Sequence, residues 1–215
     1  MRKIALYLLA LPVVALLSQG FVAPQDDADQ ILAASKAKLQ SVSDFSANFS
    51  MELNNPSMSA PVNREGSFKY KNGMYVFQMD GQEIYCDKNR TWVYLSEVNE
   101  VEVSAYDPEY SANIESIFQL YEANAEARHD GVETVGGVRC DKIFLAIKSG
   151  ELDYNRATLF IEQGSKLPRR VVLTDRRQTE TTYTFSNMRT NQGYSTSTFQ
   201  FDETDYPGVD VIELD

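Results

Sequence analysis

Between Gly66 and Asp107 the chain alternates short apolar runs with turn-forming residues. The runs are rich in aromatic and β-branched side chains, and Asn72-Gly73 and Asp80-Gly81 separate the first three of them. Asn, Asp and Gly tolerate the positive φ of two-residue hairpin loops, so these pairs indicate tight turns between neighbouring strands. Strands joined by such short turns pair antiparallel, because a parallel pair needs a long crossover. The region therefore predicts an antiparallel meander.

The strands of this meander carry large apolar side chains two residues apart, so that those within one strand share a face. They are Phe68, Tyr70, Tyr75, Phe77, Met79, Trp92 and Tyr94. Their neighbours Met74, Val76 and Val93 are apolar too, which is unusual for a sheet with one solvated face. Two interpretations fit: the aromatic residues fill an ordinary core, or the sheet curves around an apolar cavity that holds a ligand. The alternation does not tell which face is concave.

The segments on either side of this meander show helical spacing or strict alternation of their apolar residues. Residues 26–42 place Ala28, Ile31 and Leu32 on one stripe of an amphipathic helix, and Phe45–Leu53 alternates strictly between apolar and polar residues. After Pro108 the alternation gives way to a second helical stripe. It consists of Ile114, Ile117, Phe118 and Tyr121. This inserted helix either packs in the core or forms a movable lid over the cavity.

The second half of the chain returns to strands. They are expected at Val138–Lys148, Arg156–Glu162, Leu167–Thr174, Thr179–Ser186 and Ser197–Phe201. About ten or eleven strands and two helices result, a mainly β pattern typical of a sandwich or a barrel. Residues 202–215 are either a disordered tail or a final packed strand, and the apolar Val209, Val211 and Leu214 favour partial order.

Residues 1–20 have the pattern of a secretory signal peptide. Arg2 and Lys3 precede a non-polar run from Ile4 to Leu17, and the small residues Ser18 and Gly20 suit a cut after Gly20. A retained membrane anchor is the alternative, but the run is shorter than the ~20 residues that cross a bilayer. We therefore expect an exported, soluble periplasmic protein whose mature part, residues 21–215, is a single domain.

Composition narrows the classes of function. The formal net charge is −11, and signal cleavage removes two of the 20 basic residues, which disfavours binding to nucleic acid or to anionic membranes. Cys86 and Cys140 are either one disulfide or two buried thiols. The single histidine, His129, cannot supply a His-rich metal site and has no nucleophile motif beside it. We expect neither an enzyme nor a metal or cofactor.

Four stretches together resemble the periplasmic outer-membrane lipoprotein carrier family, the LolA type. They are Ser43–Phe49 after the first helix, Gly66–Phe77, Asp87–Tyr94 with Asn99–Val103, and Phe199–Asp202 with Tyr206–Val209. No single stretch is specific, but their order and spacing cover nearly the whole mature chain.

The resemblance implies an incomplete antiparallel β-barrel, in which an N-terminal helix and an inserted lid helix cover an apolar cavity. Family members in Gram-negative bacteria are chaperones that carry lipoprotein acyl chains through the periplasm to the outer membrane. The implied partners of such a monomer are acylated lipoproteins, an inner-membrane lipoprotein-releasing ABC transporter complex and an outer-membrane acceptor. The alternative is a generic periplasmic binding protein for lipid or another hydrophobic ligand.

Acyl chains need an apolar pocket because each buried CH₂ contributes ~0.8 kcal/mol. The candidate lining is the seven aromatic and methionine residues of the meander, together with the four residues of the lid. Lys71 stands where the family has an arginine that helps to hold the lid closed, and Asn72 follows where a proline is usual. Lysine lacks the planar fork of arginine, so a latch at Lys71 is expected to be weaker.

Overall fold

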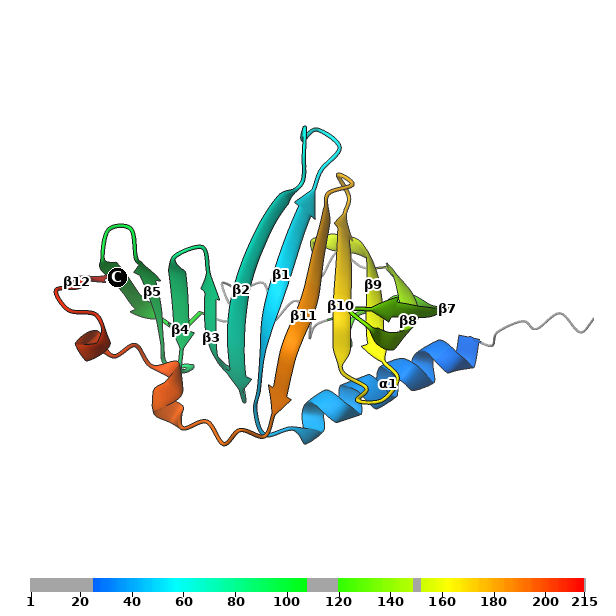
Figure 1. Cartoon of the computed structure of the whole chain (residues 1–215), viewed down its shortest axis with the longest axis horizontal. Coiled ribbons are helices and arrows are strands. Elements are labelled where there is room, and N and C mark those ends of the chain that lie inside the picture. The colour runs from blue at the N-terminus through cyan, green and yellow to red at the C-terminus, as the bar shows by residue number, and fades with distance from the viewer. Residues whose placement is uncertain (1–24, 108–119, 149–151, 215) are drawn as a thin grey trace, which may run out of the picture.

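The computed structural model describes residues 25–107, 120–148 and 152–214, and this part consists of one helix, α1 (Gln25–Ser41), one twelve-stranded sheet and two short 3₁₀ turns. The strands are β1 (Phe45–Asn54), β2 (Val62–Lys71), β3 (Met74–Met79), β4 (Gln82–Cys86), β5 (Arg90–Leu95), β6 (Glu100–Ala105), β7 (Ala125–Val135), β8 (Val138–Ile147), β9 (Tyr154–Glu162), β10 (Pro168–Asp175), β11 (Glu180–Thr190) and β12 (Asp210–Glu213). Their order in the sheet is β12-β6-β5-β4-β3-β2-β1-β11-β10-β9-β8-β7, as Figure 1 shows from left to right.

Two meanders make up this sheet. The first runs from β1 to β6 and the second from β7 to β11, and antiparallel pairing of β1 with β11 joins them. Tight turns connect β2 to β3 and β3 to β4, where Asn72 and Asp80 have φ of 50° and 52°. The edge strands β7 and β12 do not meet, so the sheet stays open. The expected mainly β fold with an incomplete barrel is confirmed.

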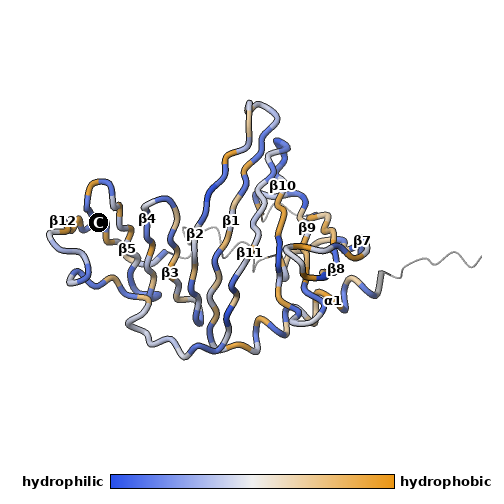
Figure 2. Tube along the Cα trace, viewed as in Figure 1, coloured by the Kyte–Doolittle hydropathy of each residue, from blue (hydrophilic) through white to orange (hydrophobic). Residues whose placement is uncertain are grey.

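α1 lies along the lower border of the sheet, beneath the strands of the second meander (Figure 1). Its side chains Ala28, Ile31 and Leu32 pack into the main hydrophobic cluster. We call the face of the sheet that carries this cluster the inner face and the opposite one the outer face. On β1, Phe45, Ala47 and Phe49 are buried on the inner face, while the polar residues between them point outward. The alternation is visible along the strands in Figure 2.

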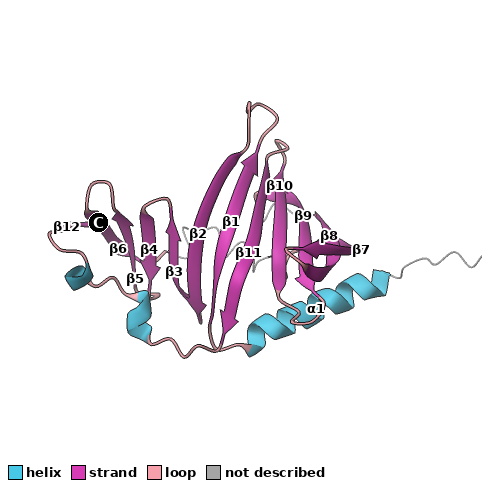
Figure 3. Cartoon of the chain, viewed as in Figure 1, coloured by secondary structure: helices cyan, strands magenta, loops and turns pink. Residues whose placement is uncertain are grey.

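The C-terminal segment, residues 191–214, leaves β11 and passes below the central strands to the first meander (Figure 3). It forms two 3₁₀ turns, η1 (Thr196–Phe199) and η2 (Glu203–Asp205), before β12 pairs parallel with β6. The predicted strand Ser197–Phe201 is therefore wrong. Hydroxyl groups there bond locally, Ser195 Oγ lying 2.8 Å from Ser197 Oγ, which favours a turn over a ladder.

The tail is a packed strand, one of the two alternatives that the sequence left open. With β12, the described sheet has one strand more than the upper end of the expected range. The predicted lid helix, with Ile114, Ile117 and Phe118, lies outside the described residues, as does the predicted signal peptide. Nothing in the described ranges is a helix long and apolar enough to span a bilayer.

The cysteines are two buried thiols, and the alternative of a disulfide is excluded for the described structure. Cys86 is on β4 and Cys140 is on β8, with six strands between them in the sheet. Bridged cysteines have Cα atoms less than about 7 Å apart, and neighbouring strands alone are ~4.8 Å apart. Sequence spacing carries no information about this separation.

Candidate functional site

An apolar row crosses the inner face of the first meander. Strand register aligns Phe68 with Phe77, Phe77 with Ile84, and Ile84 with Val93. Met79 and Leu95 lie on the same face, each two residues along its strand from the row. Both pair with Gln82, which stands between them on β4. Directly opposed residues on adjacent strands place their Cβ atoms about 5 Å apart, so the row is a continuous apolar strip.

Gly66 lets this strip pack closely against β1. A Cβ atom at Gly66 would collide with the Phe49 ring and with the carbonyl oxygen of Gln78. In the space left free, Phe49 stacks on Phe77 with ring centroids 5.3 Å apart. The close approach joins the strip to the aromatic residues of β1.

Burial of the inner face is uneven between the two meanders. In the second meander, Ile143, Leu159 and Val171 are 0% exposed. In the first meander, Phe77, Met79, Ile84, Val93 and Leu95 are only half-buried. α1 contacts β7 and β8, and its apolar residues pack there. The described structure thus leaves the inner face of β3 to β5 as an accessible apolar surface.

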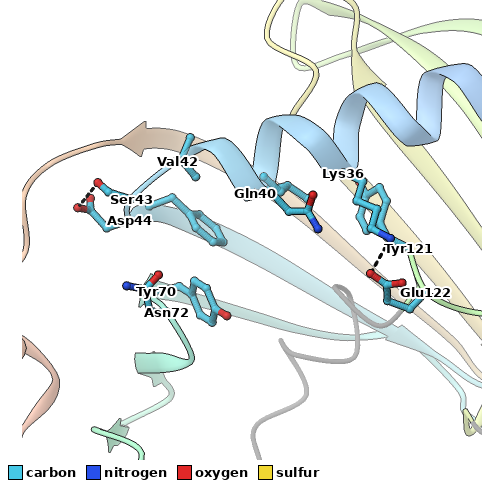
Figure 4. Close-up of a pocket in the computed structure, with 11 residues that line it drawn as sticks. Lys36, Gln40, Val42, Ser43, Asp44, Tyr70, Asn72, Tyr121 and Glu122 are labelled. Atoms are coloured by element: carbon cyan, nitrogen blue, oxygen red, sulfur yellow. Dashed lines mark hydrogen bonds and ion pairs between the residues drawn. The ribbon is translucent and has the colours of Figure 1, made fainter.

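An amphipathic pocket opens between the C-terminal end of α1 and the adjoining ends of β1 and β2 (Figure 4). Its volume is about 240 Å³. Apolar side chains line it, namely Leu39, Val42, Phe45, Tyr70 and Tyr121, with polar ones from Lys36, Gln40, Ser43, Asp44, Asn72 and Glu122. A pocket that combines apolar walls with polar groups suits a ligand with an apolar chain and a polar head.

Tyr121 forms a wall of this pocket and anchors its segment to α1. Its hydroxyl lies 2.8 Å from the hydroxyl of Ser35, which is fully buried. Burial raises the pKa of Tyr121 to about 12, so its phenol stays neutral in the physiological range. Beside it, Lys36 Nζ and Glu122 Oε1 form an ion pair of 2.7 Å. A second cavity, of about 260 Å³, is also lined by Lys36 and Tyr121, together with Leu32 of α1 and Leu145 of β8.

A family model described as "Outer membrane lipoprotein carrier protein LolA" matches residues 40–202, more than half of the chain. The chain belongs to the LolA family. This match confirms the resemblance drawn from the four stretches. A comparison with curated proteins gave no match.

Solved structures are similar to this LolA family member in fold. An uncharacterized conserved protein from Thermus thermophilus has a TM-score of 0.56 at 11% identity, with 87% of this chain and 99% of that chain covered. LprF from Mycobacterium bovis has a TM-score of 0.52 at 15% identity, with 80% and 97% covered. At such identities the likeness extends to the fold alone. The description of the family model names a lipoprotein carrier.

Five of the seven predicted lining residues share one face. Phe68, Tyr70, Phe77 and Met79 belong to the inner cluster, and the register of Tyr75 with Tyr70 places Tyr75 beside them. Whether acyl chains contact these residues stays a prediction. Tyr75 is 2% exposed and Phe68 is 4% exposed, so both form the floor of this LolA-type sheet rather than its surface.

Trp92 and Tyr94 lie on the outer face, away from the other five. Register aligns Tyr85 with Trp92 and Trp92 with Val103. Both side chains pack in a separate cluster with Phe201, Tyr206 and Val209 of the C-terminal segment. Grouping them with the inner five was therefore wrong. The reason is the pairing of β4 with β5, which brings Thr91 and Val93, not Trp92, to the inner face.

The hydroxyl groups of Tyr85 and Tyr206 hold the C-terminal segment on this outer cluster. They lie 2.9 Å apart, and each lies 2.9 Å from Glu83 Oε2, so the two phenols and the carboxylate form one hydrogen-bonded group. Burial, together with its bonds to Tyr206 and Glu83, raises the pKa of Tyr85. Burial raises the pKa of Tyr206 to about 12. The outer aromatic residues are thus covered by the chain's own C-terminal segment.

Lys71 also points away from the inner face. Its amine donates to the backbone carbonyl of Tyr194 in the C-terminal segment. This contact ties the C-terminal segment to β2, and a latch between Lys71 and a lid stays a prediction that this contact does not support.

The prediction from sequence missed Ile84, Val93 and Leu95. Each alternates with a larger or more polar neighbour, and attention to aromatic residues favoured the wrong face of β5. The two-residue turn at Asp80-Gly81 sets the β3–β4 register and was the signal that identifies Ile84. The β4–β5 pairing places Val93 and Leu95 on the same face.

Proposed function

We propose that this LolA family member is an exported periplasmic carrier that takes up the acyl chains of lipoproteins released from the inner membrane and delivers them toward the outer membrane. Residues 1–20 act as its cleaved signal peptide and residues 21–215 as one carrier domain. Its partners are the acylated cargo, an inner-membrane lipoprotein-releasing ABC transporter complex and an outer-membrane acceptor, and it works as a monomer.

The observation that carries this proposal is the half-buried apolar strip Phe77–Ile84–Val93. The amphipathic pocket at the end of α1 adds polar groups to the same molecule. An apolar surface of this kind is costly in water and is typical of a binding site. An acyl chain laid along it loses contact with water at ~0.8 kcal/mol per buried CH₂. The lipoprotein's polar head then meets Lys36, Ser43, Asn72 and Glu122.

Loading requires the pocket to widen. The two cavities beside Tyr121, about 240 and 260 Å³, are each smaller than the ~300–1,000 Å³ of ordinary ligand pockets. Both are lined by Tyr121 and Lys36, so displacement of these side chains joins them. The Ser35–Tyr121 hydrogen bond contributes ~1 kcal/mol, and the Lys36–Glu122 pair, which is partly exposed, contributes less. A ligand that buries a few methylene groups offsets this cost.

The test is native mass spectrometry, with lipid extraction, of the mature protein recovered from the periplasm. A co-purified acylated lipoprotein is the expected result. Val93→Asp places a charge on the strip and should abolish the adduct, since a carboxylate is poorly tolerated against an acyl chain. Val98→Asp is the matched control, because Val98 is 56% exposed in the β5–β6 turn, and should leave the adduct intact.

The identity of the lipid separates the two classes of carrier. Free phospholipid or another apolar molecule, lost in Val93→Asp but kept in Val98→Asp, would replace the lipoprotein carrier by a generic periplasmic lipid-binding protein. An empty protein in all three forms would contradict both. Circular dichroism melts confirm that each variant is folded, since loss of fold would also remove the adduct.

A further inference from the structure

A third pocket, distinct from the two cavities beside Tyr121, lies on the outer face, across the sheet from the apolar strip. Its volume is about 360 Å³. It spans β2, β1 and β11 and is walled by the first part of the C-terminal segment. Its lining consists of Ser46, Ala47, Asn48, Ser67, Phe68, Lys69, Asn187, Arg189 and Tyr194. The functional groups among them are two cations, hydroxyls and carboxamides, and the lining contains no acidic side chain.

Strand register brings the two cations to either side of one serine. Ser46 on β1 is directly opposite Lys69 on β2 and Arg189 on β11. Opposed Cβ atoms are about 5 Å apart, so the two long side chains start roughly 10 Å apart, on opposite sides of Ser46. From these positions a lysine and an arginine can close on one small anion between them. Arg189 offers the planar fork that binds an oxyanion through two hydrogen bonds.

Eight of the 18 lysines and arginines in the described ranges form ion pairs with carboxylates, and these two cations belong to the ten that do not. The net charge is −11, and Arg64, Arg90, Arg169 and Arg170 all form ion pairs with carboxylates. Within the described ranges, no carboxylate lies within ion-pair distance of Lys69 or Arg189. The carboxylate of Asp44, just before β1, is buried and accepts hydrogen bonds from Gln192 N, Gly193 N and Ser43 Oγ. It is already satisfied by its own turn.

The wall of the pocket is fixed in position. Tyr194 donates its hydroxyl to Ser46 Oγ at 3.0 Å, and its carbonyl accepts from Lys71. Its ring meets Phe199 edge-on at 6.3 Å and lies 5.9 Å from the Lys69 amine. A preorganised wall lowers the entropy that binding must spend on ordering the site. Lys71 adds a third positive charge near the pocket.

We propose that this outer pocket binds a phosphate-type oxyanion, with Lys69 and Arg189 as the charged ligands and the Ser46 hydroxyl and the amides of Asn48 and Asn187 as neutral donors. The shared chemistry is that of a phosphate group, whether free in solution or in a phospholipid headgroup. Because the pocket is on the face opposite the apolar strip, this site is independent of acyl binding and does not depend on the proposed carrier function.

The experiment follows backbone amide NMR shifts of the mature protein during titration with sodium phosphate, at ionic strength held constant with sodium chloride. Saturable shifts are expected at Ser46, Ser67 and Tyr194. Lys69→Gln combined with Arg189→Gln should weaken the affinity about tenfold or more, since two charge-assisted contacts are lost. Arg176→Gln, an exposed arginine in the β10–β11 turn, is the matched control and should leave the affinity unchanged.

A second arm measures co-flotation with phosphatidylcholine vesicles that contain phosphatidylglycerol. Flotation that the double variant abolishes and Arg176→Gln retains assigns the site to a headgroup, and saturation by inorganic phosphate alone assigns it to a soluble phosphate. Shifts that rise linearly without saturation, or an equal loss in the control variant, overturn the proposal. Circular dichroism melts that match those of the unmodified protein show that the double variant is folded.

Discussion

The two meanders share one sheet and the same alternation of side chains, yet the inner face is covered more completely on β8 to β10 than on β3 to β5. In the second meander, α1 covers the inner face, and Ile143 and Leu159 are fully buried. In the first, the outer face is covered, by Phe201 and Tyr206 of the C-terminal segment, while Ile84 and Val93 on the inner face are only half-buried. The inner face of β8 to β10 is therefore closed core, and the inner face of β3 to β5 offers an apolar surface.

The largest expected effect is a stability difference between two matched leucine truncations. Leu159→Ala in the second meander removes a side chain that is 0% exposed and should lower the free energy of unfolding by about 3–5 kcal/mol. Leu95→Ala removes a half-buried side chain of the first meander and should cost about 1 kcal/mol, in proportion to the smaller area that it buries. Urea denaturation measures both.

The two variants should rank in the opposite order in lipid binding. Leu95→Ala is expected to weaken retention of a fatty acid, whereas Leu159→Ala, where folded, is expected to keep it. Equal stability losses would mean that the inner face of β5 is ordinary core, and the division of the sheet into two halves would then fail.

A smaller effect is expected from the hydrogen bonds that hold the C-terminal segment on the outer face of the first meander. Asp44, at the start of β1, accepts from Gln192 N at 2.7 Å and from Gly193 N at 3.0 Å. Burial opposes ionisation of this carboxyl, but these N–H groups and the Ser43 hydroxyl outweigh it and hold its pKa below the ordinary value. The ionised group thus anchors the beginning of the C-terminal segment.

The pH dependence follows from that direction. A depressed pKa in the folded state gives stability that is complete above the unfolded pKa of about 3.9 and is lost as the pH falls through the lower folded value. Trp92 is the single tryptophan and lies beneath the C-terminal segment, so its emission should shift to longer wavelength in that acid range. Asp44→Asn should show part of this shift already at pH 7, with a stability loss of about 2 kcal/mol.

Asp175→Asn is the control from the second meander. Its carboxylate also accepts from backbone N–H groups, those of Arg177 and Thr179, and its pKa is likewise lowered, chiefly by the bond from Thr179 N. Because Asp175 caps the β10–β11 turn, its loss should leave the emission of Trp92 unchanged at neutral pH. An identical Trp92 response in both variants would show that Asp44 does not hold the C-terminal segment.

The smallest expected effect is at the junction of the two halves. Tyr121→Phe leaves the buried Ser35 hydroxyl without this partner and should lower stability by about 1 kcal/mol while speeding uptake of a fluorescent fatty acid in stopped-flow mixing. Tyr183→Phe is the control, since Tyr183 belongs to the same cluster but its hydroxyl bonds to no other described residue. Faster uptake in both variants would assign the effect to general loosening.

Much of the fold was predictable because local patterns carried it. Asn72-Gly73 and Asp80-Gly81 specified tight turns, and the strict alternation from Phe45 onward specified which side of β1 is buried. The candidate site was less predictable. Trp92 and Tyr94 are large aromatic residues like Phe77, but the β4–β5 pairing sets Trp92 opposite Tyr85 and Tyr94 opposite Glu83, which places them on the other face. The strand expected at Ser197–Phe201 failed because local hydroxyl bonds and the burial of Phe199 favoured a turn.

The sequence by itself determined the antiparallel meanders, the amphipathic helix and the membership in the LolA family, because alternation, turn chemistry and the order of motifs are local or linear properties. Only the tertiary structure decided which face is inner, that Cys86 and Cys140 lie far apart, that Lys71 binds Tyr194, and that Lys69 and Arg189 flank Ser46. These depend on strand register and on where α1 and the C-terminal segment pack. Contacts between residues far apart in the sequence set the pairing of β1 with β11 and the packing of α1 and the C-terminal segment, and no local pattern encodes these.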